Sequence, residues 1–183
     1  MPRIEPLEYE QMPPDARAAH DEHLEVARIT NMKRTLLHSV PAFDALMTWY
    51  RLRDTVRPFL GERLTTLFAH AVSAETDCLI CSTFFRRILV DSGENPDALE
   101  MDEREAAVVA FGRALAQTPH RVPDALYAPV AAFFDDEQMV ALTAFGALMV
   151  ATNVINNVLQ VPLDDYLQPY RKHPAAEGIG AHG

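Results

Sequence analysis

The chain has 183 residues, of which 49% are hydrophobic, so it is long enough to form one domain with a substantial buried core. Its 26 acidic and 16 basic residues give a formal net charge of −10, and no run of basic residues is longer than a pair such as Arg86 and Arg87. This balance argues against nucleic acid or an anionic membrane as a partner. The acidic, proline-rich N-terminus lacks the apolar core of a secretory signal, which predicts a cytoplasmic protein.

Helix signals follow one another along the whole chain. Apolar residues recur at helical spacing, and prolines, glycines and capping residues mark the ends of each periodic segment. The predicted helices cover residues 15–29, 31–37, 41–56, 61–76, 78–92, 103–117, 124–134 and 136–160. No segment alternates as a strand would, and the chain has only 7 glycines, so the predicted fold is all-α.

Three parts are expected along the chain. Residues 1–29 are predicted to form an N-terminal arm and helix, residues 30–170 the helical domain, and residues 171–183 a flexible C-terminal tail. The last helix is apolar on nearly every side from residue 139 to 155, although Asn153, Asn156 and Asn157 interrupt its end. A membrane span is disfavoured because the apolar run is shorter than about 20 residues. We expect this helix in the core, between subunits, or both, which predicts a homo-oligomer.

The only two cysteines, Cys78 and Cys81, form a CxxC pair at the start of a predicted helix. Asp77 occupies a position typical of an N-cap, and Gly93 a position typical of a C-cap. Unpaired N–H groups and the positive end of the helix dipole favour a thiolate there. In a reducing cytoplasm such a pair is more often redox-active than a permanent crosslink.

Other interpretations of the pair compete with a redox role. Two small buried hydrophobes that happen to be close would look the same in the sequence. A zinc site is disfavoured because no second CxxC or HxxxH supplies the remaining ligands, and a thioredoxin-like fold because both flanks are helical. We therefore expect neither a metal nor a cofactor.

Three stretches resemble the carboxymuconolactone decarboxylase or AhpD-like (alkylhydroperoxidase D-like) family. They are KRTLLHSVPAFDALM, LTTLFAHAVSAETDCLIC and MVALTAFGALMVATNVINNVLQVPLD, and together they extend over residues 30–166. The resemblance implies an all-helical subunit in a trimer or hexamer. It also implies a small-molecule hydroperoxide or disulfide as substrate and an external dithiol as reductant.

The resemblance also assigns roles to the two thiols. Cys81 would attack the substrate, and Cys78 would then form a disulfide with it. The redox members of the family also carry a glutamate and a histidine for proton transfer, but the matching positions here hold Thr66 and Phe85. The usual proton relay is therefore absent.

His70 is the residue that the sequence offers as a replacement base. It lies four residues after Thr66, and a tight turn between the two helices would place it opposite residues 81–85. A histidine beside a thiol can accept its proton and stabilise the thiolate. The alternative is that His70 only fills the contact between two helices.

The sequence therefore favours a thiol-dependent oxidoreductase whose catalytic residues are Cys78, Cys81 and His70. One alternative is a relative of the lactone decarboxylases, although that chemistry requires no thiols. Another is an oligomeric binding or sensing protein that has lost catalysis together with the glutamate and histidine.

Overall fold

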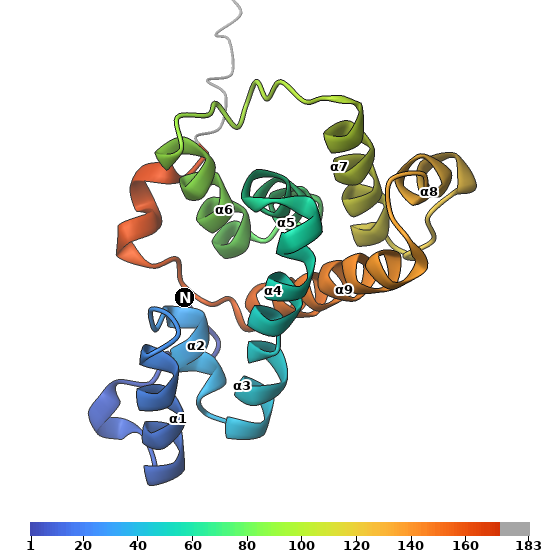
Figure 1. The fold of residues 1–183 in the computed structure, drawn as a ribbon. Helices are drawn as coiled ribbons and strands as arrows, with labels where there is room; N and C mark the ends of the chain where they lie inside the picture. The colour runs from blue at the N-terminus through green and yellow to red at the C-terminus, as the bar shows by residue number, and fades with distance from the viewer. Residues whose placement is uncertain (173–183) are drawn as a thin grey trace, which may run out of the picture.

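The structure is a computed structural model that describes residues 1–172. Within these residues the chain forms helices without any β-strand, which confirms the all-α prediction (Figure 1). The helices are η1 (Tyr9–Gln11), α1 (Pro14–Leu24), α2 (Asn31–Leu36), α3 (Val40–Met47), α4 (Trp49–Leu60), α5 (Glu62–Glu75), α6 (Leu79–Asp91), α7 (Glu103–Ala116), α8 (Asp124–Ala131), α9 (Asp136–Leu159) and η2 (Asp165–Tyr170). Most of the tail predicted at residues 171–183 lies outside the described residues.

Capping residues explain where the long helices begin. The Asp102 carboxylate accepts the backbone N–H of Glu105 at the start of α7, and Asp135 does the same for Gln138 at the start of α9, each at 2.8 Å. In both cases the third helical residue bonds back to the cap, which completes a capping box. Gly93 follows α6 with φ +86, as the sequence predicts for a C-cap glycine.

The single helix predicted at residues 41–56 is wrong, because the chain forms two helices there. Thr48 separates α3 from α4, and its hydroxyl donates to the Ala45 carbonyl at 2.6 Å. A side chain that bonds a nearby carbonyl in this way competes with regular helix. α4 then continues past Pro58, which lies in its last turn, and ends at Gly61 with φ +82.

Helix α5 lies at the centre of the core and packs against α4, α6, α7 and α9. Its Phe68 is fully buried and stacks against Phe111 and Phe145, with ring centroids 6.4 and 5.9 Å away. A Cβ at Gly112 or Gly146 would lie 2.9 Å from the Phe68 ring. These two glycines therefore allow α7 and α9 to approach α5 closely.

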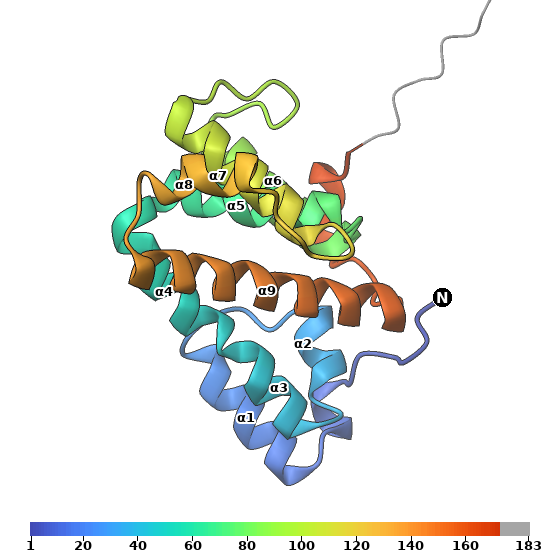
Figure 2. The same ribbon diagram turned by 90° about the vertical axis from the view of Figure 1, so that its right-hand side faces the viewer.

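The long helix α9 separates two parts of the subunit. Figure 2 shows α5 to α8 on one side of α9, and α1 to α3 on the other. The N-terminal part has its own small apolar cluster, built from Met12, Ala16, Leu36, Leu37 and Phe43.

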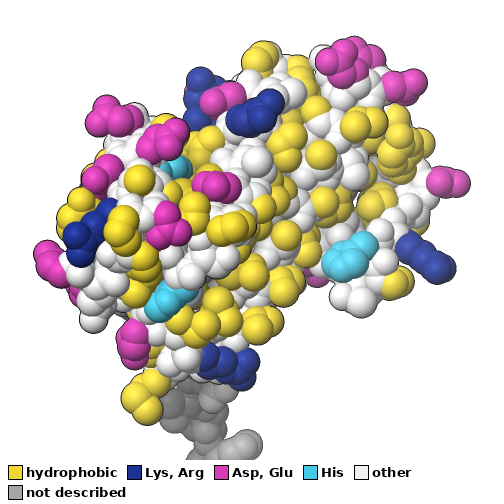
Figure 3. All heavy atoms as spheres, turned by 90° about the horizontal axis from the view of Figure 1, so that it is seen from below, with side chains coloured by type: hydrophobic (Ala, Val, Ile, Leu, Met, Phe, Trp, Pro, Cys, Tyr) yellow, Lys and Arg dark blue, Asp and Glu magenta, His cyan; other side chains and the backbone are white. Residues whose placement is uncertain are grey.

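Much of α9 remains exposed. Its outer face carries Val140, Val154 and Val158, each at least 50% exposed, and Figure 3 shows hydrophobic side chains across the underside of the molecule. Within residues 1–172, α9 is the one helix that is long and apolar enough to cross a membrane, a property that core helices of globular proteins share.

Candidate active site

The cysteine pair lies at the turn between α5 and α6. The sequence predicts Asp77 as the N-cap, but Asp77 has φ +51 and Cys78 is the N-cap residue. A left-handed aspartate ends α5 and reverses the chain, so α6 starts at Leu79, one residue later than predicted. The Cys78 N–H donates back to the Ser73 carbonyl at 3.0 Å, which holds the turn against α5.

Both thiols are free and buried, with Cys78 fully inaccessible and Cys81 8% exposed. The Asn156 side-chain amide of α9 donates to both sulfurs, at 3.6 Å from Cys78 and 3.4 Å from Cys81. The same Nδ2 lies 3.6 Å from the Met32 sulfur. The Asn156 Oδ1 is buried without a hydrogen-bond partner, so this amide is oriented towards sulfur at the expense of its oxygen.

The two thiols do not ionise alike. The Cys81 thiol donates to the Cys78 sulfur and lowers the pKa of Cys78 to about 7, and the backbone N–H of Cys81 and the Asn156 amide act in the same direction. The hydrogen bond to Cys78, together with burial, raises the pKa of Cys81. The pair therefore gives up one proton near neutral pH and holds the second one tightly.

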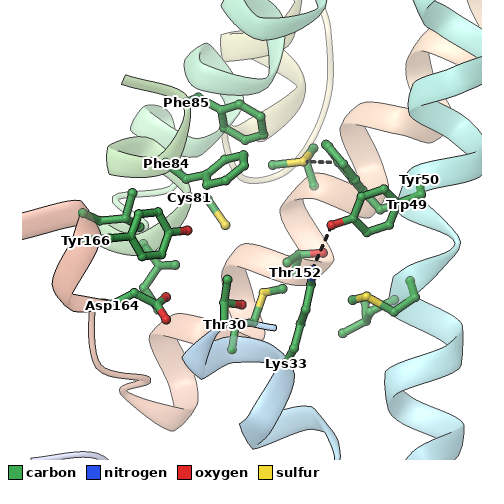
Figure 4. Close-up of a pocket in the computed structure, with 16 residues that line it drawn as sticks. Thr30, Lys33, Trp49, Tyr50, Cys81, Phe84, Phe85, Thr152, Asp164 and Tyr166 are labelled. Atoms are coloured by element: carbon green, nitrogen blue, oxygen red, sulfur yellow. Dashed lines mark hydrogen bonds between the residues drawn. The ribbon is translucent and has the colours of Figure 1, made fainter. Parts of the chain in front are cut away.

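Cys81 borders a cavity of about 90 Å³ between α2, α4, α6 and η2 (Figure 4). Its walls are mostly aromatic and apolar, and Cys78 is not part of them. Trp49 donates from Nε1 to the Met149 sulfur at 2.7 Å, which fixes the indole ring beside the cavity. The lining residues are Thr30, Met32, Lys33, Leu46, Met47, Trp49, Tyr50, Ile80, Cys81, Phe84, Phe85, Met149, Thr152, Asp164, Tyr166 and Leu167.

Polar groups gather at one end of this cavity. The Lys33 ammonium is buried and donates to the Tyr50 hydroxyl at 2.9 Å and to the Arg28 carbonyl at 2.6 Å. Burial lowers the pKa of Lys33 to about 8. Asp164 accepts the Asn31 N–H at 2.9 Å through Oδ1, its Oδ2 has no partner, and burial raises its pKa. The cavity thus has titratable groups beside its thiol.

His70, the predicted base, is half-buried in α5 and does not line this cavity. Burial lowers the pKa of His70 to about 4, and the positive charges of Arg86 and Arg113 add to this effect. No hydrogen bond joins His70 to either sulfur among residues 1–172. The structure therefore brings Cys78 and Cys81 together without bringing His70 into the same cavity, and its role as a base stays a prediction.

Thr66 and Phe85, which stand where the sequence resemblance implies a glutamate and a histidine, have structural contacts. The Thr66 hydroxyl donates to the Glu62 carbonyl within α5 at 3.0 Å. Phe85 is buried in the cavity wall, with its ring centroid 6.2 Å from that of Trp49. Neither side chain can transfer a proton to or from the thiols.

Sequence reasoning missed Asn156 and Lys33. Asn156 is one of three asparagines that interrupt an apolar helix, and a buried amide in such a helix requires a partner. For Lys33 the only signal in the sequence is the rarity of lysine, which occurs only at Lys33 and Lys172. Among residues 1–172 no group of three histidine, cysteine, aspartate or glutamate residues could hold a metal ion.

Comparison with solved structures identifies the fold. The debrominase Bmp8 without ligand superposes with a TM-score of 0.74 at 16% identity, over 91% of this chain and 95% of that chain. A Bmp8 variant with one cysteine replaced by alanine, in complex with 2,3,4-tribromopyrrole, gives 0.75 at 15% identity, over 91% and 94%. The AhpD core of an uncharacterised peroxidase-related protein from Ralstonia eutropha JMP134 gives 0.67 at 18% identity, again over 91% and 94%.

These matches define an all-helical protein with the alkylhydroperoxidase-like architecture. The chain has the AhpD-like fold, which confirms the resemblance found in the sequence at the level of structure. No family model matches the sequence, and no curated protein matches it.

Proposed function

We propose that this protein is a thiol-dependent oxidoreductase of the alkylhydroperoxidase-like type, with Cys78 and Cys81 as its redox pair. The observation that carries the proposal is the difference in position between the two sulfurs. Both contact the Asn156 amide, but only Cys81 borders the cavity. A substrate can therefore reach Cys81, while Cys78 is positioned behind it.

The pair can replace the missing proton relay. Cys78 loses the first proton because its pKa is about 7. As Cys81 attacks a hydroperoxide, Cys78 accepts the Cys81 proton along the hydrogen bond between them. The Cys81 sulfur bonds to the terminal oxygen, the O–O bond breaks, and the alkoxide takes a proton to leave as an alcohol. Lys33 and Tyr50 are the candidate donors of that proton, because both line the cavity.

The second step closes the cycle. Cys78 attacks the sulfenic acid at Cys81, a disulfide forms, and water leaves. An external dithiol then reduces the disulfide and is itself oxidised. A cytoplasmic location would supply such dithiols and forms part of the proposal. His70 remains a candidate base that acts from outside the cavity.

Turnover with a dithiol donor tests the proposal. The wild-type protein should consume tert-butyl hydroperoxide at the expense of dithiothreitol, and mass spectrometry of the oxidised protein should show a loss of two hydrogens within one peptide. Cys81→Ser should abolish turnover, whereas Cys78→Ser should still form a sulfenic acid. Equal turnover by wild type and Cys81→Ser would exclude the mechanism, and rates no higher than the uncatalysed one in both would favour a non-catalytic, divergent relative.

A second candidate reaction is reductive dehalogenation by the same thiols. It is favoured by the aromatic cavity at Cys81, together with the likeness to a debrominase whose cysteine variant was solved with tribromopyrrole. In that reaction the two thiols supply two electrons, a ring carbon exchanges its halogen for a proton, and halide leaves as the disulfide forms. Release of bromide from tribromopyrrole in the presence of a dithiol would distinguish it from peroxide reduction.

The oligomer is also part of the proposal. The exposed valines of α9 form an apolar stripe along the helix, and stripes of this kind are usually covered by another chain. We expect a trimer or hexamer in which α9 contributes to the contact.

A further inference from the structure

Positive charges line a second cavity beside the Cys81 cavity, which is the inner cavity of the two. This second cavity has a volume of about 260 Å³ and shares Thr30, Lys33, Tyr50, Phe84 and Tyr166 with the inner one. Arg28 and Arg87 complete its wall. Three cationic side chains therefore line the second cavity in a protein whose net charge is −10.

Two of these cations lack an anionic partner. Lys33 donates to a carbonyl and a hydroxyl, and the Arg28 guanidinium lies over the Tyr166 ring at 4.4 Å. Among residues 1–172 no carboxylate is within salt-bridge distance of either side chain. Unpaired positive charge beside an apolar cavity is typical of a site that binds an anion.

Arg87 is paired but has a donor to spare. Its Nη1 donates to Asp91 at 2.9 Å, while its Nε is buried without a hydrogen-bond partner. The only carboxylate that lines the inner cavity is Asp164. Even when Asp164 is ionised, the three cations outnumber the one carboxylate among the residues that line the two cavities, and Asp91 offsets only the charge of Arg87.

We infer that the substrate of this site is a small organic anion, with its acidic group held among Arg28, Lys33 and Arg87 and its apolar body at Cys81. The inference rests on the proposed function for the choice of Cys81 as the reacting group, and it adds the substrate class. The inner volume of about 90 Å³ limits the body to a single small ring or a short chain, since benzene occupies an engineered cavity of about 150 Å³. Trp49 and Phe84 provide flat surfaces for such a body.

Trp49 provides the measurement, because it is the only tryptophan in the chain and lines the inner cavity. Its fluorescence can be titrated with pyrrole-2-carboxylate and with the neutral pyrrole-2-carboxamide, which has nearly the same shape. We expect the anion to bind at least tenfold more tightly than the amide. Equal dissociation constants for the two probes, or no saturable change with either, would overturn the inference.

Charge-neutralising variants locate the acidic group. Arg28→Gln and Arg87→Gln should each reduce the preference for the anion at least threefold, and Arg87→Lys should restore part of it. Arg86→Gln is the matched control, because Arg86 neighbours Arg87 but pairs with Asp97 and lines neither cavity. A loss of preference in the control as large as in Arg87→Gln would also overturn the inference.

The binding assay is independent of thiol chemistry. Cys81→Ser should keep the anion preference, since the serine variant retains all three cations. A wild-type protein that selects the anion but consumes no oxidant would contradict the proposed function alone, and one that turns over without selecting the anion would contradict this inference alone.

Discussion

Asn156 offers the sharpest test of how the thiol pair is activated. Its Nδ2 is the side-chain amide donor shared by Cys78 and Cys81, and its Oδ1 is buried without a partner. The substitution Asn156→Leu keeps the branched shape and removes both amide atoms. The folded protein then loses a donor to the thiolate and also loses an unsatisfied acceptor.

The two losses have opposite effects, which makes the test selective. A hydrogen bond to a charged group contributes about 1.5–3 kcal/mol, and a bond to a sulfur contributes about the lower of these values. Loss of the amide should therefore raise the pKa of Cys78 by about one unit. The Cys78 thiolate fraction at pH 7 would fall about fivefold, from about one half to about one tenth. Because an unsatisfied buried acceptor costs about 1–3 kcal/mol, the free energy of unfolding should stay unchanged or increase by about 1 kcal/mol.

The assay is the ultraviolet absorbance of the thiolate from pH 5 to 10, which requires no reagent to reach the buried Cys78, combined with urea unfolding of the reduced protein. Asn153→Leu serves as the control, since Asn153 is equally buried in α9 but donates to Thr76 and Ser73 instead of sulfur. This control also removes a buried oxygen that lacks a partner, the Asn153 Oδ1, and it should keep its thiol pKa. An unchanged pH profile in Asn156→Leu would refute the role of the amide and leave the helix N-terminus as the activator.

Three further predictions follow from the buried charges and the exposed helix. Burial lowers the pKa of Lys33 to about 8, so the folded state binds fewer protons than the unfolded state, and the free energy of unfolding should rise between pH 8 and about 10.4. Lys33→Met should flatten that rise in urea unfolding, and an unaltered slope would contradict this prediction. The pKa of His70 is lowered to about 4, so the free energy of unfolding should fall as the pH falls from about 6.5 towards 4. His70→Gln should reduce this loss of stability. An alkylation of Cys81 that is tenfold slower at pH 7 in the same variant would instead support His70 as the base. Val140→Glu combined with Val154→Glu should convert the oligomer to a monomer in light scattering, and a monomeric wild type would disprove the assembly.

The sequence predicted the features that depend on local pattern. Helix periodicity and capping gave the all-α fold, and Asp102, Asp135 and Gly93 mark helix ends as expected. The N-cap prediction for Asp77 was wrong for a local reason. Aspartate is common both at N-caps and in the left-handed conformation that Asp77 adopts, so the residue type does not distinguish them. Thr48 divided a predicted helix through one hydroxyl contact, which periodicity does not report.

The chemistry of the site could not be read from the sequence in the same way. Asn156 lies 75 residues from Cys81, and Lys33 reaches the cavity from a different helix. Which buried polar group meets which sulfur is decided by the packing of α9 and α2 against α6. The prediction for His70 rests on its distance along the chain from a turn, whereas the rotation of α5 about its own axis decides which neighbours the side chain contacts.

The contact between Phe68 and the glycines of α7 and α9 reaches further than the core that it fills. Gly146 and Asn156 are ten residues apart on one straight helix, which corresponds to about 15 Å. Because one helix carries both residues, the close approach of α9 to the Phe68 ring at Gly146 and the contact of Asn156 with the two sulfurs depend on the same position of α9. A larger residue at Gly146 would push α9 outward, and the first chemical consequence would appear one and a half nanometres away, as a thiol pair without its amide donor.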